Sequence, residues 1–364
     1  MPEFVKGLEL SRLFYEEAVA PALAAEFPGL RHAAALLGTG SEVLGFDTEM
    51  SADHCWGPRV DLFLEPEEWD LSDPVREALR HKLPRRFRGY PTSFTEPDPA
   101  DNGTQHLDTR DVGPVNHKVE LMTPRGFFRN YLAFDIEHEI EPADWLTFPE
   151  QKLRTVRSGA VFHDDIGLAE VRQRFDYYPR DVWLYQLAAA WARVGQEEHL
   201  MGRAGYVGDE IGSALIGARL VRDLMRLCFL MERTYAPYPK WFGTAFKQLS
   251  CAAALSPHLG AALAARQWQE RERHLVAAYR LVAELHNDLG LTAPVPAEPR
   301  GFFGRPFRVI ELHGFARRLL EKIEDERVRR IAARRPVGGI DTFSDSTDLV
   351  SHAAWRATLR KLYE

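Results

Sequence analysis

The chain has 364 residues, 45% of them hydrophobic and 27% charged, which is the composition of an ordinary globular protein with room for two domains. Its net charge of −7 argues against broad electrostatic binding to long nucleic acid. No run approaches the roughly 18 apolar residues of a membrane span, and the first residues lack a signal-peptide pattern. The three cysteines are widely spaced, so we expect reduced thiols and a cytoplasmic location.

The first half of the chain alternates helical and strand-like patterns. Apolar residues recur at helical spacing over 4–26. Strands are predicted at 32–38, 59–65, 115–123 and 158–167. The Pro-, Asp- and Arg-rich residues 66–111 predict an irregular or partly helical insertion. In the third strand Val119 and Leu121 flank Glu120, so we expect Glu120 on the face opposite the apolar one.

After residue 177 the periodicity is helical. Helices are predicted at 181–201, 207–233, 238–249, 257–289, 308–324 and 347–363. Gly290 is placed to end the fourth of these helices, and the Pro- and Gly-rich segment 291–306 is typical of a linker. The sequence therefore predicts an α+β domain over 1–177 and an all-helical domain over 178–364.

The stretch GTGSEVLGFDTEMSADHCW, residues 38–56, combines a glycine-serine turn with several carboxylates. Backbone N–H groups in such a turn can hold phosphate oxygens. Carboxylates on nearby strands can hold Mg²⁺, which commonly bridges to substrate phosphates during an in-line displacement. Gly40 and Ser41, followed by Asp53 on an expected strand and Glu120 on a neighbouring one, predict a nucleotide-phosphate site.

This stretch resembles the signature of the nucleotidyltransferase superfamily, which has the polymerase-β-like fold. That signature is a Gly-Ser pair, then two acids one residue apart, then a third acid on a later strand. Other stretches resemble a bacterial group within the superfamily, the domain of unknown function DUF4037; they are DHCWGPRV, MGRAGYVGDEIGS, YAPYPKWFG and DTFSDSTD. The resemblance implies a mixed-sheet nucleotidyltransferase domain followed by a helical domain, with the active site in the cleft between them.

The resemblance implies a role for each matching residue of the first domain. Gly40 and Ser41 would contact the triphosphate, and Asp53 and Glu120 would be catalytic carboxylates that hold Mg²⁺ or Mn²⁺. The second acid of the signature would stand two residues after Asp53, where this chain has Cys55. A thiol is a poor Mg²⁺ ligand, because it is soft and mostly protonated. Three other acids could take its place: Asp47, Glu49 and Asp61.

Four residues of the helical half are further candidates. Lys240 lies among aromatic residues at a helix start, and the resemblance implies that it binds the triphosphate. Arg203 could meet a phosphate, and Asp209 or Glu210 could be the catalytic base for an acceptor hydroxyl. The alternatives are a solvated Lys240 beside Trp241, an Arg203–Asp209 ion pair, and an Asp209 that merely favours the positive end of its helix.

The predicted reaction is Mg²⁺-dependent transfer of a nucleoside monophosphate from an NTP to a small-molecule acceptor, with release of pyrophosphate. A protein or tRNA acceptor is the alternative. A non-catalytic nucleotide-binding or regulatory protein is a hypothesis of a second class, and Cys55 is its best support. The cluster FHDD, residues 162–165, favours a strand-end turn over a His/Asp metal site. The base of the NTP and the oligomeric state stay open.

Overall fold

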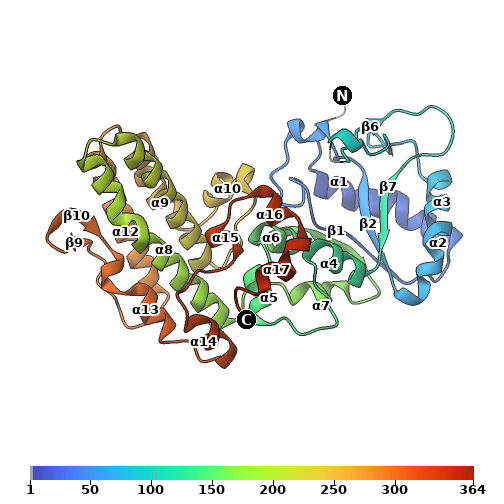
Figure 1. The fold of residues 1–364 in the computed structure, drawn as a ribbon. Coiled ribbons are helices and arrows are strands. Elements are labelled where there is room, and N and C mark those ends of the chain that lie inside the picture. Colours follow the sequence, from blue (N-terminus) through green and yellow to red (C-terminus); the bar gives the residue numbers. More distant parts are fainter. Residues whose placement is uncertain (1–2, 102) are drawn as a thin grey trace. The chain divides into compact units, whose positions relative to one another are not determined.

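The computed structural model describes residues 3–101 and 103–364, which form two compact units (Figure 1). The first unit comprises Met1–Glu139 and Lys152–Asp176, and the second comprises Ile140–Gln151 and Tyr177–Glu364. The segment 140–151 is therefore part of the helical unit, although it precedes the boundary drawn from the sequence.

A four-stranded mixed sheet in the order β7-β2-β1-β8 forms the centre of the first unit. Its strands are β1 (His32–Leu36), β2 (Arg59–Leu64), β7 (Lys118–Met122) and β8 (Ala160–Asp164). β1 runs antiparallel to β2 and β8, whereas β2 and β7 are parallel. Each strand lies inside a range predicted from the sequence, and the α+β class with a mixed sheet is confirmed.

Helices and apolar side chains cover both faces of this sheet. One face carries Val60, Leu62 and Leu64, which belong to a core with α1 (Gly7–Phe14), a π turn (Tyr15–Val19), α2 (Ala20–Glu26) and α3 (Ser72–Lys82). The other face carries Phe63, which belongs to a core with Phe127 of α4 (Pro124–Leu132) and with α7 (Leu168–Gln173). Each fully buried Leu or Phe contributes roughly 1.5–3 kcal/mol, so these two cores fix the strand that lies between them.

The insertion between β2 and β7 is partly helical, as its composition predicts. It contains two 3₁₀ helices, α3 and two short hairpins. The 3₁₀ helices are Pro66–Leu71 and Pro99–Asp101, and the hairpins are β3 (Arg86–Phe87) with β4 (Tyr90–Pro91) and β5 (Ser93–Phe94) with β6 (Leu107–Asp108). This insertion brings residues 105 and 106 against the loop that precedes β2.

A capped helix follows β7 directly and holds the end of that strand in place. The Thr123 hydroxyl accepts the amide of Gly126 at 3.0 Å, and Pro124 supplies the fixed φ of a first helical residue. The resulting helix α4 ends at Ala133, which adopts a left-handed φ of 50°. β7 and Glu120 are thus anchored at the strand's carboxyl end.

The second unit is built on two long antiparallel helices, α8 (Arg180–Tyr206) and α9 (Glu210–Met231), which lie side by side in Figure 1. The shorter helix before them is α5 (Pro142–Thr147), whereas α6 (Glu150–Ser158) begins at the end of the segment 140–151 and lies mostly in the first unit. The helices after α8 and α9 are α10 (Pro239–Phe246), α11 (Ala252–Ala264), α12 (Trp268–Asp288), α13 (Phe315–Leu320), α14 (Glu326–Ala332), α15 (Ile340–Phe343), α16 (Thr347–Ser351) and α17 (Arg356–Arg360).

Three helices predicted in this half are wrong in part. The predicted helix 347–363 is divided by the extended His352 into α16, a 3₁₀ turn (Ala353–Trp355) and α17. The predicted helix 257–289 is interrupted, because Ala265 is extended and ends α11 before α12 begins. The predicted helix 308–324 begins as β10 (Arg305–Val309), which pairs with β9 (Arg300–Phe302) inside the expected linker. Phe303 and Gly304 adopt φ of 45° and 76° and make the tight turn, after which only α13 is helical.

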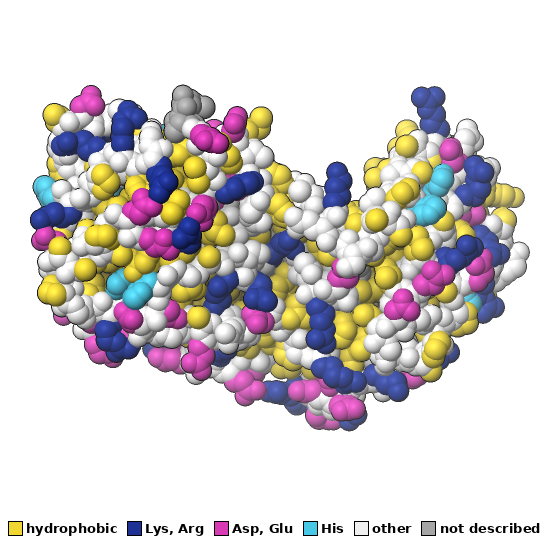
Figure 2. Space-filling view, turned by 180° about the vertical axis from the view of Figure 1, so that it is seen from behind, with side chains coloured by type: hydrophobic (Ala, Val, Ile, Leu, Met, Phe, Trp, Pro, Cys, Tyr) yellow, Lys and Arg dark blue, Asp and Glu magenta, His cyan; other side chains and the backbone are white. Residues whose placement is uncertain are grey.

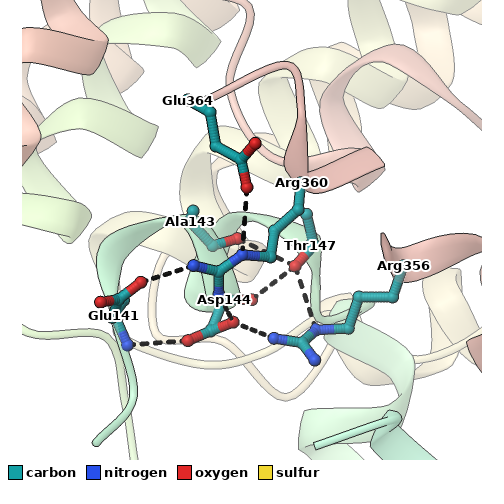
Figure 3. A network of polar contacts seen from close by, with 7 residues as sticks. All are labelled: Glu141, Ala143, Asp144, Thr147, Arg356, Arg360 and Glu364. Atoms are coloured by element: carbon teal, nitrogen blue, oxygen red, sulfur yellow. Dashed lines mark hydrogen bonds and ion pairs between the residues drawn. The ribbon is translucent and has the colours of Figure 1, made fainter. Parts of the chain in front are cut away.

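A buried carboxylate explains why residues 140–151 belong to the helical unit. Figure 3 shows Asp144 of α5 bound by the guanidinium groups of Arg356 and Arg360 of α17. Arg356 also donates to the Thr147 hydroxyl at 3.2 Å, and Arg360 also pairs with Glu141. Asp144 is 2% exposed, so removing either arginine would leave its charge poorly compensated.

The described surface mixes charges of both signs. On the face shown in Figure 2, basic and acidic side chains alternate and do not gather by sign. Among the described residues, no helix has the length and apolar character needed to cross a membrane.

Candidate functional site

Two carboxylates stand next to each other on the parallel strands β2 and β7. Asp61 and Glu120 are paired in register, two residues along from the pair Arg59 and Lys118. In-register residues of parallel strands point to the same face, and neighbouring strands are about 4.8 Å apart, so the two carboxylates can meet at one ion. Glu120 is exposed between buried Val119 and Leu121, which confirms the face predicted for it.

The glycine-serine loop is tied to the same edge of β2. Asp61 accepts the amide of Leu37 at 2.8 Å, and Arg59 donates to the carbonyl of Thr39 at 2.9 Å. Arg59 also pairs with the buried carboxylate of Glu42 at 2.6 Å. The strand that carries Asp61 therefore also fixes the loop that follows β1.

Glycine is required at position 40 of this loop. Gly40 has a φ of 148°, and a Cβ there would lie 2.7 Å from the Glu42 carboxylate that pairs with Arg59. Any side chain would push that carboxylate away, and an L-residue would be strained at this φ. The next residue, Ser41, begins a turn in which the Phe46 amide donates to its carbonyl at 2.9 Å.

Burial and the charged groups around β2 and β7 shift the pKa of Asp61. Burial raises the pKa of Asp61 from 3.8 to about 6; Arg59 and the Leu37 amide lower it, and Glu120 and Glu42 raise it. Burial also lowers the pKa of Lys118. A negative charge at Cys55 would raise that pKa, and it is the largest of the effects that oppose burial. Asp61 is thus a buried acid whose negative charge only partly finds compensation in the protein.

The residues present fit a divalent cation held by two carboxylates. Mg²⁺ is usually held by one or two carboxylates, with substrate phosphates and water completing its shell. Asp61 and Glu120 supply such a pair, and a cation there would offset the charge of the buried Asp61. Among the described residues, no set of three carboxylates converges at this edge.

Asp53 does not lie on a strand, so that part of the sequence prediction is wrong. It ends the 3₁₀ helix Glu49–Asp53, its side chain is 63% exposed, and its carboxylate binds His54 at 2.6 Å. The strand begins six residues later because Gly57 and Pro58 follow the left-handed Cys55, whose φ is 51°. The role of Asp53 as a metal ligand stays a prediction.

Of the three acids proposed to replace Cys55, Asp61 is the one in register with Glu120. Asp47 is buried and accepts the Gly7 amide at 2.7 Å and the Trp56 indole at 3.2 Å, so it holds α1 to the loop. Glu49 is exposed in the first turn of its 3₁₀ helix.

The structure does not bring the candidates of the helical half to one place. Arg203 and Asp209 lie at the turn between α8 and α9, whereas Lys240 follows the other end of α9. The 22 residues of α9 span about 33 Å. Asp209 caps α9 by accepting the Gly212 amide at 2.8 Å, and the Lys240 ammonium lies 5.0 Å from the Trp241 ring.

Sequence reasoning missed Lys152, a buried lysine beside the glycine-serine loop. Its ammonium donates to the Tyr131 carbonyl at 2.7 Å and lies 4.9 Å from the Tyr131 ring. Tyr131 in turn approaches Gly38 at the start of the loop. Burial lowers the pKa of Lys152 to about 8. A lone lysine in the helical sequence EQKLRTV gives no sign of this burial.

A second group of side chains could hold a metal ion. His32, His163 and Asp165 have ligand atoms within 4.8 Å of one another, although FHDD was expected to be only a strand-end turn. His32 Nδ1 lies 3.0 Å from the Leu30 carbonyl and its Nε2 lies 2.9 Å from the Tyr15 hydroxyl. A ring nitrogen bound to a carbonyl is the usual orientation of a metal-binding histidine, and the donor set suits Zn²⁺ better than Mg²⁺.

Comparison with known proteins gives a family match to part of the chain and a similar solved structure. A family described as "Domain of unknown function (DUF4037)" matches residues 145–242, which confirms the resemblance to this family seen in the sequence. A nucleotidyltransferase-like protein from Exiguobacterium sibiricum 255-15 is similar in structure, with a TM-score of 0.32 and 10% identity over 78% of this chain and 77% of that chain. No curated protein matches the chain.

Proposed function

We propose that the chain is a nucleotidyltransferase that moves a nucleoside monophosphate from an NTP to a small-molecule hydroxyl and releases pyrophosphate. One observation carries the proposal: Asp61 and Glu120 stand in register at the edge where Asp61 and Arg59 hold the glycine-serine loop. A phosphate-binding loop beside a pair of carboxylates is the arrangement that metal-assisted phosphoryl transfer needs.

Each part of this edge has a role in the proposal. Asp61 and Glu120 hold Mg²⁺ or Mn²⁺, which would neutralise phosphate charge when bound. The loop at Gly40 and Ser41 offers amides to the phosphates, and Lys152 adds a positive charge behind it. The acceptor oxygen bonds to the α-phosphorus, the bond to pyrophosphate breaks, and the acceptor proton passes to a base.

A small acceptor is favoured over a long nucleic acid. The net charge is −7, and the visible face in Figure 2 has no extended basic area. Long nucleic acid binds through many phosphate contacts to clustered lysine and arginine.

The test measures pyrophosphate release with each NTP and Mg²⁺ or Mn²⁺, in the presence of a fractionated small-molecule extract as acceptor. We expect Asp61→Asn and Glu120→Gln to reduce release to background. Glu49→Gln is the matched control, because Glu49 is an exposed acid of the same stretch, and we expect it to leave release unchanged.

Asp53→Asn decides between the two assignments of the metal ligand. Loss of release with Asp53→Asn and full release with Asp61→Asn would overturn the site proposed here and restore the sequence-based one. NTP binding without turnover under all these conditions would instead favour a non-catalytic nucleotide-binding protein, which the missing third carboxylate also favours.

A further inference from the structure

The helical unit contains a cavity that the proposed function does not use. A chamber of 480 Å³ lies between α8, α9 and the segment 336–345. A second chamber of 300 Å³ adjoins it and shares Arg222, Ser344 and Asp345 with it. Both volumes lie near the range of sites that bind small molecules. The sequence stretches YAPYPKWFG and DTFSDSTD both contribute to the walls.

Four arginines face this cavity from two helices. Arg219, Arg222 and Arg226 follow one another along α9, and Arg193 faces them from α8. The spacings of three and four residues place the arginines of α9 on one side of the helix. Guanidinium groups arranged in this way recognise phosphate through forked N–H donors.

Buried acids fix these arginines from behind without satisfying all their donors. Glu197 pairs with Arg193 at 3.1 Å and also with Arg219. Asp223 lies 3.5 Å from Arg193 and 3.8 Å from Arg222. Neither acid lines the cavity, so they orient the guanidinium groups from the protein side.

Several guanidinium N–H groups stay without a hydrogen-bond partner among the described residues. They are clearest at Arg226, whose buried Nε and Nη1 have no acceptor within hydrogen-bond distance in the described part of the chain, whereas Nε of Arg193 and Nε of Arg222 face Asp223 at 3.5 Å and 3.8 Å. The closest acid to Arg226 is Asp341, at 4.0 Å. A buried donor without an acceptor is costly, so this set of donors indicates an anionic ligand.

The second chamber offers an apolar wall beside these donors. Pro237, Pro239 and Phe242 line it, and the Arg226 guanidinium lies 5.6 Å from the Phe242 ring. A ring system can pack against this wall while an attached anion reaches the arginines.

We propose that this cavity binds a small organic phosphate that carries a ring, with its phosphate on Arg193, Arg222 and Arg226 and its ring against Phe242. Asp345 pairs with Arg222 at 2.6 Å, but its side chain is 73% exposed. The ligand phosphate displaces the exposed Asp345 carboxylate from Arg222, while Asp341 keeps its hydrogen bond from the Glu150 amide.

The test is calorimetric titration of the full chain with AMP, phenyl phosphate, inorganic phosphate and adenosine, in EDTA so that no metal-dependent binding contributes. We expect one site for AMP or phenyl phosphate, competition by inorganic phosphate, and weaker binding of adenosine. Arg222→Gln and Arg226→Gln should each weaken binding about tenfold or more, because each removes charge-assisted hydrogen bonds.

Three further variants make the result specific. Asp345→Asn removes the competing carboxylate and should tighten binding, which a misfolded variant would not do. Phe242→Ala should weaken AMP and leave inorganic phosphate unchanged. Arg273→Gln, an exposed arginine of α12, is the matched control and should have no effect.

Two results would overturn the proposal. One is that neither AMP nor phenyl phosphate binds. The other is that binding survives Arg222→Gln and Arg226→Gln but is lost in Glu120→Gln, which would place the ligand on the sheet. An absence of pyrophosphate release would not count against this proposal, because the titration measures binding and needs no turnover.

Discussion

Replacing Asp61 with asparagine should stabilise the protein at neutral pH. Asp61 is 8% exposed, and burial raises its pKa from 3.8 to about 6. The folded chain therefore binds the proton of the Asp61 carboxyl more tightly than the unfolded chain does. The stability that this bound proton contributes is lost as the pH rises through 6. Above pH 7 the full pKa shift lowers the free energy of unfolding by about 3 kcal/mol, and about 1.5 kcal/mol of this loss is already present at pH 5. Asparagine carries no charge and can still accept the Leu37 amide.

The assay is urea unfolding of the wild type and Asp61→Asn at pH 5 and pH 8. We expect the variant to be more stable by about 1.5 kcal/mol at pH 5 and about 3 kcal/mol at pH 8. Asp53→Asn is the matched control, because it is the same substitution at an exposed acid outside the sheet. Mn²⁺ should stabilise the wild type and not Asp61→Asn. A variant that is less stable at both pH values, or a difference that does not grow with pH, would refute the reasoning.

Three other changes test neighbouring features. Gly40→Ala should destabilise the fold by about 1–3 kcal/mol in urea unfolding, and by more than Gly45→Ala, because Gly45 also has a positive φ but nothing within 4 Å of an added Cβ. Cys55→Asp should tighten Mn²⁺ binding in calorimetry while Cys55→Ser does not, since the left-handed φ of 51° accepts aspartate; equal affinities would contradict this. Co²⁺ should give a visible absorption band that His163→Gln abolishes, and a band that persists would exclude the site formed with His32 and Asp165.

Alternation and helical period were enough to predict the sheet and the long helices. β2 could be predicted because RVDLFL places apolar residues on both faces of a short run, which is typical of a strand buried on two sides. The predicted helix 308–324 was wrong because the turn at Phe303 and Gly304 reverses the chain, and the pairing of β9 with β10 then outweighs local helical spacing. This hairpin is local, and the signal it leaves in the sequence is the turn glycine Gly304, which the Pro- and Gly-rich composition of 291–306 assigned to a linker.

The candidate site depends on the register between β2 and β7, which residue spacing in the sequence does not encode. Glu120 and its face could be predicted because Val119 and Leu121 flank it. The partner of Glu120 could not, because the register of two parallel strands separated by 53 residues, 65–117, follows from packing on both faces of the sheet. One clue was present in the sequence, namely a single acid inside the apolar run RVDLFL, since a buried carboxylate needs a specific compensation.

Cys55 has a different meaning once the strand is placed. The sequence made it the position of a missing metal ligand, yet it lies in the loop before β2, where its amide donates to the Gln105 carbonyl at 2.7 Å. A thiolate there would act on Lys118 and Arg59, the two cations that stand two residues before Glu120 and Asp61 on the same strands. Position 55 therefore tunes the charge around the carboxylate pair, and an acid there would compete with the phosphates for the same cations. Lys118 itself donates to the Gln105 side chain and lies 5.6 Å from the Phe94 ring, so the loop that holds Cys55 and the cation beside Glu120 are joined through the same residue, Gln105.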